Sequence, residues 1–217
     1  MSPPDSYAKN VSSNRRTNNK HMVNEKKLED LTPEELGKLF PIQIVPYDKN
    51  WVNIFNSESR LIKDTLGDNI ALKIEHFGST AVDGISAKPT IDILVEIPFL
   101  TDNLKEMIIQ KMTEIDYHFI WRTDERLPYM HFVKGYTIDG FKGNVFHIHM
   151  GDKSHPLWDR ICFRDYLRRN KKVAEEYEAL KISLAEKFKY DREAYTNAKS
   201  EFIKRITEIA KNENGSC

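Results

Sequence analysis

The sequence predicts an α+β protein, in which a mixed β-sheet has helices packed on one face and is followed by a C-terminal block of helices. Strand-like segments alternate with helical ones as far as about residue 152, and from residue 155 to 210 the periodicity is helical throughout. The order strand, helix, strand, strand, helix, three strands and then helices suits a sheet covered on one face better than strict alternation of strand and helix. We expect a single domain over residues 40–210, with the sheet in 40–152 and the helical block in 155–210.

The composition favours a cytoplasmic globular protein. The 217 residues are 40% hydrophobic and 30% charged, with a formal net charge of zero, so the overall charge gives no reason to expect a nucleic-acid partner. Residues 1–24, rich in Ser, Asn, Lys and Arg, predict a flexible basic extension. The two cysteines and the lack of an apolar leader or membrane-length apolar run favour the cytoplasm and no membrane partner. No pattern indicates an oligomeric state.

Capping and breaking residues set the expected element boundaries. Thr32, directly before a proline, predicts a short helix start. A strand over 42–45 is expected to end at Pro46, and Asp48 to cap a helix over 49–66. The remaining segments are predicted as strands over 72–77, 90–97, 117–122, 129–134 and 144–150, a hairpin connection over 135–143, and helices over 102–115, 156–169, 173–188 and 195–209.

The densest group of chemically useful residues lies in the predicted strand, glycine turn, loop and strand between residues 72 and 97. Strand alternation puts Asp92, Leu94 and Glu96 on one face, and apolar residues that form a wall for helices on the other. Asp92 either meets a cation or a metal ion, or is a structural acid bonded to loop N–H groups. Glu96 lies about 13 Å from Asp92 along the strand, too far to share one ion with it.

The glycine turn that follows the first strand predicts an oxyanion site. Gly78 allows close backbone approach, and the hydroxyls of Ser79 and Thr80 can hold a phosphate oxygen. Lys88, at the end of the loop, can add a positive charge. Arg164 belongs to a helical stripe of arginines that is either a solvated face or a phosphate contact over the sheet.

A pair of histidines forms the other candidate group. His147 and His149 alternate onto one strand face, and His76 ends the strand before the glycine turn. Such histidines can ligate a transition metal, contact a phosphate or serve as core residues, and the pattern leaves these alternatives open.

Between about residues 42 and 206 the chain closely resembles the GrpB family, an uncharacterised family of nucleotidyltransferase-like fold, in its opening I-V-P-Y-D-K-N-W and in five later segments. They are E-H-F-G-S-T-A-V-D-G-I-S-A-K-P-T-I-D-I-L-V, H-I-H, F-R-D-Y-L-R, A-E-E-Y-E-A-L-K and D-R-E-A-Y-T-N-A-K-S-E-F-I. The resemblance implies a glycine-serine turn, an acidic pair two residues apart on the next strand and a third acid from a later strand, which together hold two Mg²⁺ ions. Gly78, Ser79 and Asp92 match this pattern, but Leu94 stands at the second acid position, which puts the standard transfer mechanism in doubt.

The resemblance and the residues together imply two functions for one pocket. The first is a metal-dependent nucleotidyltransferase acting on a nucleotide or phosphorylated small molecule. The second is a non-catalytic module that binds such a ligand in a degenerate site. The expected catalytic residues are Asp92, Glu75 and His149. The expected phosphate ligands are Gly78, Ser79, Thr80, Lys88 and Arg164. The expected metal ligands are Asp92, His147, His149 and His76, for Mg²⁺ or Mn²⁺, or for Zn²⁺ if the histidines bind it.

Overall fold

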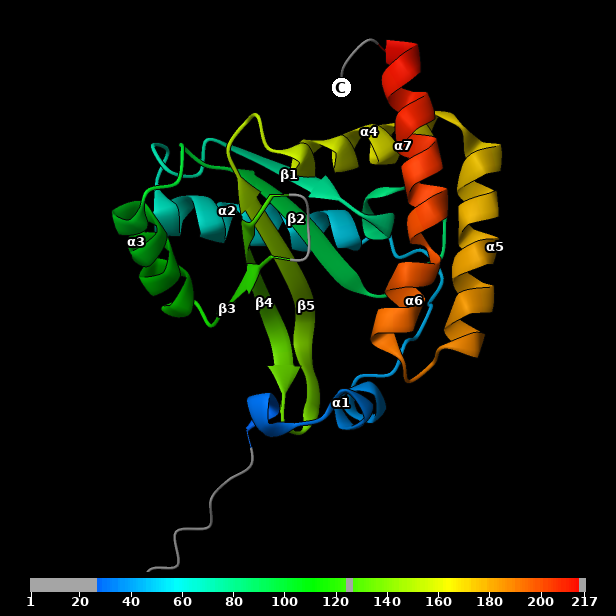
Figure 1. The fold of residues 1–217 in the computed structure, drawn as a ribbon, viewed down its shortest axis with the longest axis horizontal. Coiled ribbons are helices and arrows are strands. Elements are labelled where there is room, and N and C mark those ends of the chain that lie inside the picture. Colours follow the sequence, from blue (N-terminus) through cyan, green and yellow to red (C-terminus); the bar gives the residue numbers. More distant parts are fainter. Residues whose placement is uncertain (1–26, 124–126, 215–217) are drawn as a thin grey trace, which may run out of the picture.

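A five-stranded sheet forms the centre of the fold (Figure 1). The computed structural model describes residues 27–123 and 127–214, so the predicted extension over residues 1–24 lies outside the described residues. The strands lie in the order β1-β2-β5-β4-β3. β2 and β5 are parallel and the other neighbours antiparallel, which confirms the predicted mixed sheet. The strands are β1 (Lys73–Phe77), β2 (Thr90–Glu96), β3 (His118–Arg122), β4 (Tyr129–Thr137) and β5 (Gly140–Gly151).

The helices fall into an N-terminal group and the predicted C-terminal block. Thr32 caps the first α-helix by accepting the Glu35 N–H, and Thr101 caps α3 by accepting the Leu104 N–H. The α-helices are α1 (Pro33–Leu39), α2 (Trp51–Leu66), α3 (Asp102–Thr113), α4 (Asp159–Arg169), α5 (Lys171–Lys187), α6 (Arg192–Ala198) and α7 (Ser200–Asn214). Three short 3-10 segments are η1 (Leu28–Asp30), η2 (Ser79–Ala81) and η3 (Pro156–Trp158).

The main core lies between one face of the sheet and the helices α2 and α3. Ile91, Ile93 and Val95 of β2 point to this face and are at most 2% exposed. Ile62 of α2 and Ile108 of α3 belong to the same buried cluster. The apolar wall predicted from strand alternation is therefore where the helices pack.

The helical block has a second core, which it shares with the loop between β1 and β2. Val82 and Ile85 of this loop pack with apolar residues of α4, α5 and α7. Lys181 of α5 donates to the Ser86 carbonyl, and the Glu178 carboxylate accepts the Ser86 N–H. These contacts hold the loop against α5, so the glycine turn at its start has a fixed position.

Four boundaries differ from the sequence predictions. Instead of a strand over 42–45 there is a single bridge between Val45 and Ala87, because Pro46 has no N–H with which to extend a ladder. The residue directly before α2 is Asn50, not the predicted Asp48. The Asp48 carboxylate instead accepts the Asn50 N–H, in a turn ahead of the helix. β4 continues to residue 137 and β5 already begins at residue 140, so the hairpin connection is shorter than predicted. The last predicted helix is divided into α6 and α7 at Lys199.

None of the helices within the described residues is both long enough and apolar enough to span a membrane.

Candidate functional site

Asp92 lies in the middle of β2, on the sheet face opposite the main core. Its cross-strand partners are Phe77 of β1 and His147 of β5, and directly paired residues point to the same face. The Asp92 side chain is 26% exposed. This position is the centre of the candidate site.

The Asp92 side chain lies where a side chain at position 78 would begin. A Cβ atom at Gly78 would lie 2.2 Å from Asp92 Oδ2, and the backbone φ of +72° is one that glycine tolerates best. The carboxylate therefore rests directly against the glycine turn. The next residue, Ser79, forms a side-chain hydrogen bond with the buried Tyr177 of α5, so the turn, the strand and the helical block meet here.

Three cationic side chains gather around this carboxylate. Burial raises the pKa of Asp92, against the opposing influence of Lys88, Arg160 and Lys199. Burial also lowers the pKa of Lys88, helped by neighbouring Arg192 and Lys199. The pKa of Lys199 falls to about 8, again chiefly through burial. The cluster is therefore richer in positive than in negative charge.

The two lysines lie against one aromatic ring. Lys199 Nζ is 4.2 Å and Lys88 Nζ 5.8 Å from the ring centre of the buried Tyr195 in α6. Such contacts hold an ammonium group in place through the negative face of the ring. The helical block thus contributes both a cation and its support to the Asp92 pocket.

A line of polar side chains runs from Arg192 to Asp92. Arg192 Nη2 donates to the Tyr136 hydroxyl (3.2 Å), which lies 2.7 Å from His147 Nε2. Since arginine only donates, the tyrosine hydroxyl accepts from it, and its own proton remains available to donate to His147 Nε2. The proton of neutral His147 is then on Nδ1, which lies 3.7 Å from Asp92 Oδ1. Burial holds the pKa of His147 well below its ordinary value, so the ring is neutral.

His149 lies one row further along the sheet and is held by an arginine. Arg160 Nη1 is 2.8 Å from His149 Nδ1, which must therefore accept. Burial and then Arg160 lower the pKa of His149 well below its ordinary value. His131, the cross-strand partner of His149 on β4, completes a group of histidines with His147. Their nearest ligand atoms all lie within 4.8 Å of one another.

Two nitrogens of the histidine group already have hydrogen-bond partners. His149 Nδ1 already accepts from Arg160, and His147 Nε2 from Tyr136. A metal would have to displace the proton on the remaining nitrogen of each ring and sit beside the Arg160 guanidinium. The arrangement is closer to a neutral, hydrogen-bonded polar core than to a zinc site, whose ligands present lone pairs to the ion.

The resemblance described above implies divalent ions at the carboxylates, and the residues around Asp92 fit such ions poorly. Leu94 is fully buried in an apolar cluster with Phe77, Tyr129 and Leu157. Mg²⁺ is held by carboxylate and other oxygen ligands, and Asp92 is the sole carboxylate of β2 at this point. Glu96, two residues beyond Leu94, pairs instead with Lys73 and Gly151 at the far end of the strand.

Glu75 pairs with Leu94 and so shares the sheet face of Asp92, but its carboxylate is engaged by Arg164. Arg164 Nη1 lies 2.7 Å from both Glu75 Oε2 and the His76 carbonyl oxygen, and Nε lies 2.7 Å from Asp165 Oδ1. Arg164 is only 7% exposed. The structure therefore gives the predicted phosphate ligand Arg164 and the predicted catalytic Glu75 a shared structural role, which ties α4 to β1.

His76 and Thr80 are also engaged elsewhere. His76 pairs with Ile93 and so lies on the main-core face, stacked on Phe55 at 4.7 Å. Thr80 Oγ1 donates to the Thr90 carbonyl (3.1 Å) and therefore accepts from His76 Nε2 (3.0 Å). The structure thus separates His76 from the other two predicted histidines, and the Thr80 hydroxyl from the Asp92 pocket.

Several residues that the fold brings to the pocket are not predicted from the sequence. Arg192, Tyr195 and Lys199 come from the last of the five segments that resemble the GrpB family, so a signal was present without an assigned role. Tyr136 and His131 come from β4, and the register of β4 against β5 is what places them beside the histidine pair. No local sequence pattern specifies that register.

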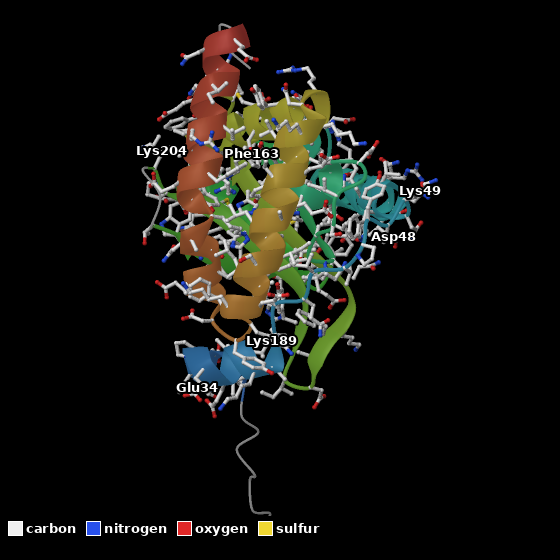
Figure 2. All side chains as sticks on the ribbon, turned by 90° about the vertical axis from the view of Figure 1, so that its right-hand side faces the viewer. Glu34, Asp48, Lys49, Phe163, Lys189 and Lys204 are labelled. Carbon is white, nitrogen blue, oxygen red and sulfur yellow. The ribbon has the colours of Figure 1, made fainter. Side chains whose placement is uncertain are left out.

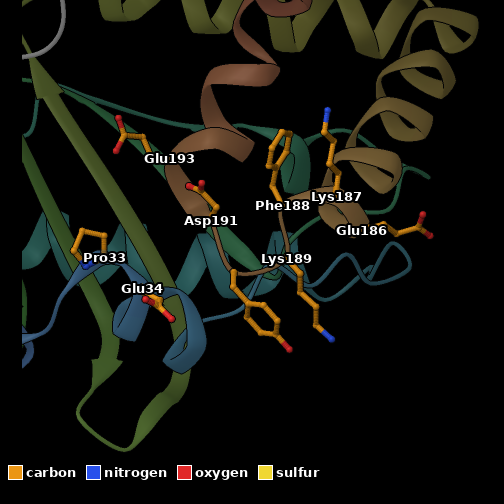
Figure 3. A pocket seen from close by; sticks show the side chains of 9 residues that line it. Pro33, Glu34, Glu186, Lys187, Phe188, Lys189, Asp191 and Glu193 are labelled. Atoms are coloured by element: carbon orange, nitrogen blue, oxygen red, sulfur yellow. The ribbon is translucent and has the colours of Figure 1, made fainter.

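An open pocket of about 680 Å³ lies elsewhere, between α1 and the turn from α5 to α6 (Figure 3). Its walls include Glu34, Phe188 and Tyr190, and none of the predicted site residues. Its lining holds four acidic side chains and two lysines, so it offers no surplus of positive charge to a phosphate.

Comparison with known proteins identifies relatives along most of the chain. Residues 41–209 match the family described as GrpB protein. The glutamate-rich protein GrpB of Alkalihalophilus pseudofirmus is 35% identical over 168 residues, which cover 75% of this chain and 92% of that protein. A UPF0157 protein of Pseudomonas aeruginosa is 37% identical over 166 residues, 76% of this chain and 66% of that protein.

Solved structures agree with this family. The crystal structure of the conserved protein GrpB from Enterococcus faecalis has a TM-score of 0.68 and 28% identity, covering 79% of this chain and 98% of that one. A structure of the Cid1 poly(U) polymerase reaches a TM-score of only 0.44 at 14% identity, too low to support an argument about this chain. On the match over residues 41–209 and the 35% identity to a named member, the chain belongs to the GrpB family.

Proposed function

We propose that the pocket around Asp92 binds the phosphate groups of a nucleotide or another phosphorylated small molecule. The observation that carries this proposal is the excess of positive charge: Lys88, Arg160 and Lys199 act on a single carboxylate, and Arg192 acts on both lysines. Buried or partly buried cations are costly unless a partner of opposite charge compensates them. A phosphate anion supplies the missing negative charge.

The lysine environments support an anion as the missing partner. Burial and neighbouring cations push both Lys88 and Lys199 toward their neutral forms. A bound phosphate would restore their charge and accept hydrogen bonds from both ammonium groups, which are among the stronger hydrogen bonds in proteins. Gly78 allows a ligand to approach the backbone closely, and the Ser79 hydroxyl is a neighbouring polar contact.

Binding without transfer is the form of the proposal that the geometry favours, because Leu94 removes the second carboxylate. Transfer of a nucleotidyl group is the second candidate, and one observation favours it. Burial raises the pKa of Asp92, which makes this carboxylate a better proton acceptor for an attacking hydroxyl than an ordinary aspartate. In that role Asp92 would act as the general base, and His147, whose Nδ1 lies 3.7 Å from Asp92 Oδ1, would help to orient the carboxylate.

Thermal unfolding with a panel of nucleotides, coenzyme A and inorganic tripolyphosphate tests the proposal. A ligand present at 100 times its Kd stabilises the folded state by about 2.7 kcal/mol, which is readily measured. Lys199→Met should weaken binding by about 1.5–3 kcal/mol, the contribution of a hydrogen bond to a charged group.

Lys204→Met is the matched control, since Lys204 is an exposed lysine on α7 near Lys199 in sequence (Figure 2). It makes the same change in net charge without touching the pocket, so its ligand stabilisation should equal that of the wild type. Equal losses in both variants would show that only long-range charge matters. A panel in which no phosphorylated compound stabilises the wild type would refute the proposal.

A further inference from the structure

We infer that the ammonium groups of Lys88 and Lys199 take the place of divalent metal ions in this pocket, so that phosphorylated ligands bind as metal-free polyanions. The inference rests on the proposed function and goes further, because it specifies the charge state of the ligand and excludes a metal bridge between ligand and protein. The residues around Asp92 lack the oxygen ligands that a divalent ion needs. Around Asp92 the sheet offers Leu94 along the strand and His147 across it, and neither supplies a second carboxylate oxygen.

The nitrogen that faces Asp92 is also a donor. The Tyr136 hydroxyl accepts from Arg192 and keeps its own proton, which it can donate to His147 Nε2. The proton of the neutral ring therefore stays on Nδ1, 3.7 Å from Asp92 Oδ1. A metal ion bound to Asp92 on this edge would meet an N–H group where it needs a lone pair.

Cations already occupy the surroundings in which a metal ion would lie. Lys88, Arg160 and Lys199 all act on the Asp92 carboxylate. Both lysine ammonium groups lie against the Tyr195 ring, which supports them from the helical block. A divalent ion beside Asp92 would be repelled by these charges, whereas a phosphate is attracted by them. Phosphate binding by lysine and arginine without a metal is common in proteins.

Chelation then has a predictable effect on binding. Mg²⁺ neutralises two negative charges of a nucleoside triphosphate, and these are the charges that Lys88, Arg192 and Lys199 attract. Free ATP should therefore bind more tightly than Mg-ATP. A site that uses a metal bridge shows the opposite order.

Isothermal titration of the full chain with ATP, in EDTA and in excess Mg²⁺, tests the inference. We expect binding in EDTA and binding that is several-fold weaker in Mg²⁺. Binding that requires Mg²⁺ would overturn the inference and leave the proposed function standing. If neither ATP nor any other phosphorylated compound of the thermal panel binds in either buffer, the proposed function itself fails, and the inference fails with it.

Two variants and a metal-only measurement sharpen the test. Lys199→Met should lose at least tenfold in ATP affinity in EDTA, and Lys204→Met should not; equal affinities for all three proteins would overturn the assignment of Lys199. Equilibrium dialysis against Mn²⁺ alone should leave the protein without bound metal. One retained equivalent of Mn²⁺ that Asp92→Asn abolishes would also overturn the inference. Circular dichroism and the urea midpoint of each variant show whether it is folded.

Discussion

Replacing Arg164 with methionine should destabilise the protein and leave its ligand affinity unchanged. Arg164 is 7% exposed and bonds to Glu75, Asp165 and the His76 carbonyl, each at 2.7 Å. Removing one partner of a buried ion pair typically costs about 3–5 kcal/mol. The Glu75 side chain is 25% exposed and regains some hydration, so we expect the lower end, about 3 kcal/mol.

Urea denaturation followed by circular dichroism measures this cost. In a thermal scan the same change should lower Tm by about 6–12 °C for a chain of this size. Arg169→Met, at an exposed arginine of the same helix, is the control and should change stability by less than about 0.5 kcal/mol. A double-mutant cycle with Glu75→Gln should give a coupling of about 1–3 kcal/mol.

The destabilisation should also depend on pH. Burial acts to raise the pKa of Glu75, but hydrogen bonds and charges from Arg164 and Lys73 outweigh it and the pKa is lowered. A lowered carboxyl pKa contributes stability that is present above the ordinary pKa of 4.5 and is lost as the pH falls through the folded-state value. The difference between wild type and Arg164→Met should therefore shrink in acid. A loss of under about 1 kcal/mol at neutral pH, with a tenfold loss of nucleotide affinity, would refute this reasoning and make Arg164 a ligand residue.

Three further predictions concern the pocket itself. Gly78→Ala should destabilise the protein by about 2–4 kcal/mol in urea denaturation. The new Cβ would lie 2.2 Å from Asp92 Oδ2, and the backbone φ of +72° is strained for alanine. A stable variant that still binds ATP would contradict this. ATP is fully ionised above about pH 7.5, so any further change of its affinity with pH comes from the protein. The affinity should fall as the pH rises through about 8, because Lys199 loses its proton there. A calorimetric profile that stays flat would argue against contact with Lys199. In competitive acetylation near neutral pH, read by mass spectrometry, Lys199 and Lys88 should react early and ATP should protect both. Lys181 has a pKa of about 7 but is 2% exposed, so it should stay unmodified, and its rapid labelling would show that burial does not govern access.

Local signals predicted the elements well because they act over a few residues. The Thr32 cap, the alternation of β2 and the helical periodicity after residue 155 all needed only neighbouring residues, and each is present in the structure. The mixed sheet also followed from the order of these elements. Family resemblance placed Gly78 and Asp92 together, and they are in contact.

The composition of the pocket depends on strand register and on long-range packing, which no local pattern encodes. His76 and His147 each alternate within their own strand, but only the pairing of His76 with Ile93 and of His147 with Asp92 shows that the two rings point to opposite faces. Similarly, a helical stripe cannot show that Arg164 bonds to Glu75, or that Lys199 at the end of α6 reaches Asp92.

The contacts that fix the glycine-turn loop have a consequence for how the pocket forms during folding. Ser86 is bonded to Glu178 and Lys181, at sequence separations of 92 and 95. Glu75 is bonded to Arg164, at a separation of 89. Contacts of such long sequence separation form slowly, because the intervening chain must first be closed into a loop. A nascent chain can pair its strands as soon as β5 leaves the ribosome, yet its Asp92 carboxylate then has neither Arg192 nor Lys199 beside it. Ligand competence should therefore appear as a late kinetic phase, after the sheet has formed.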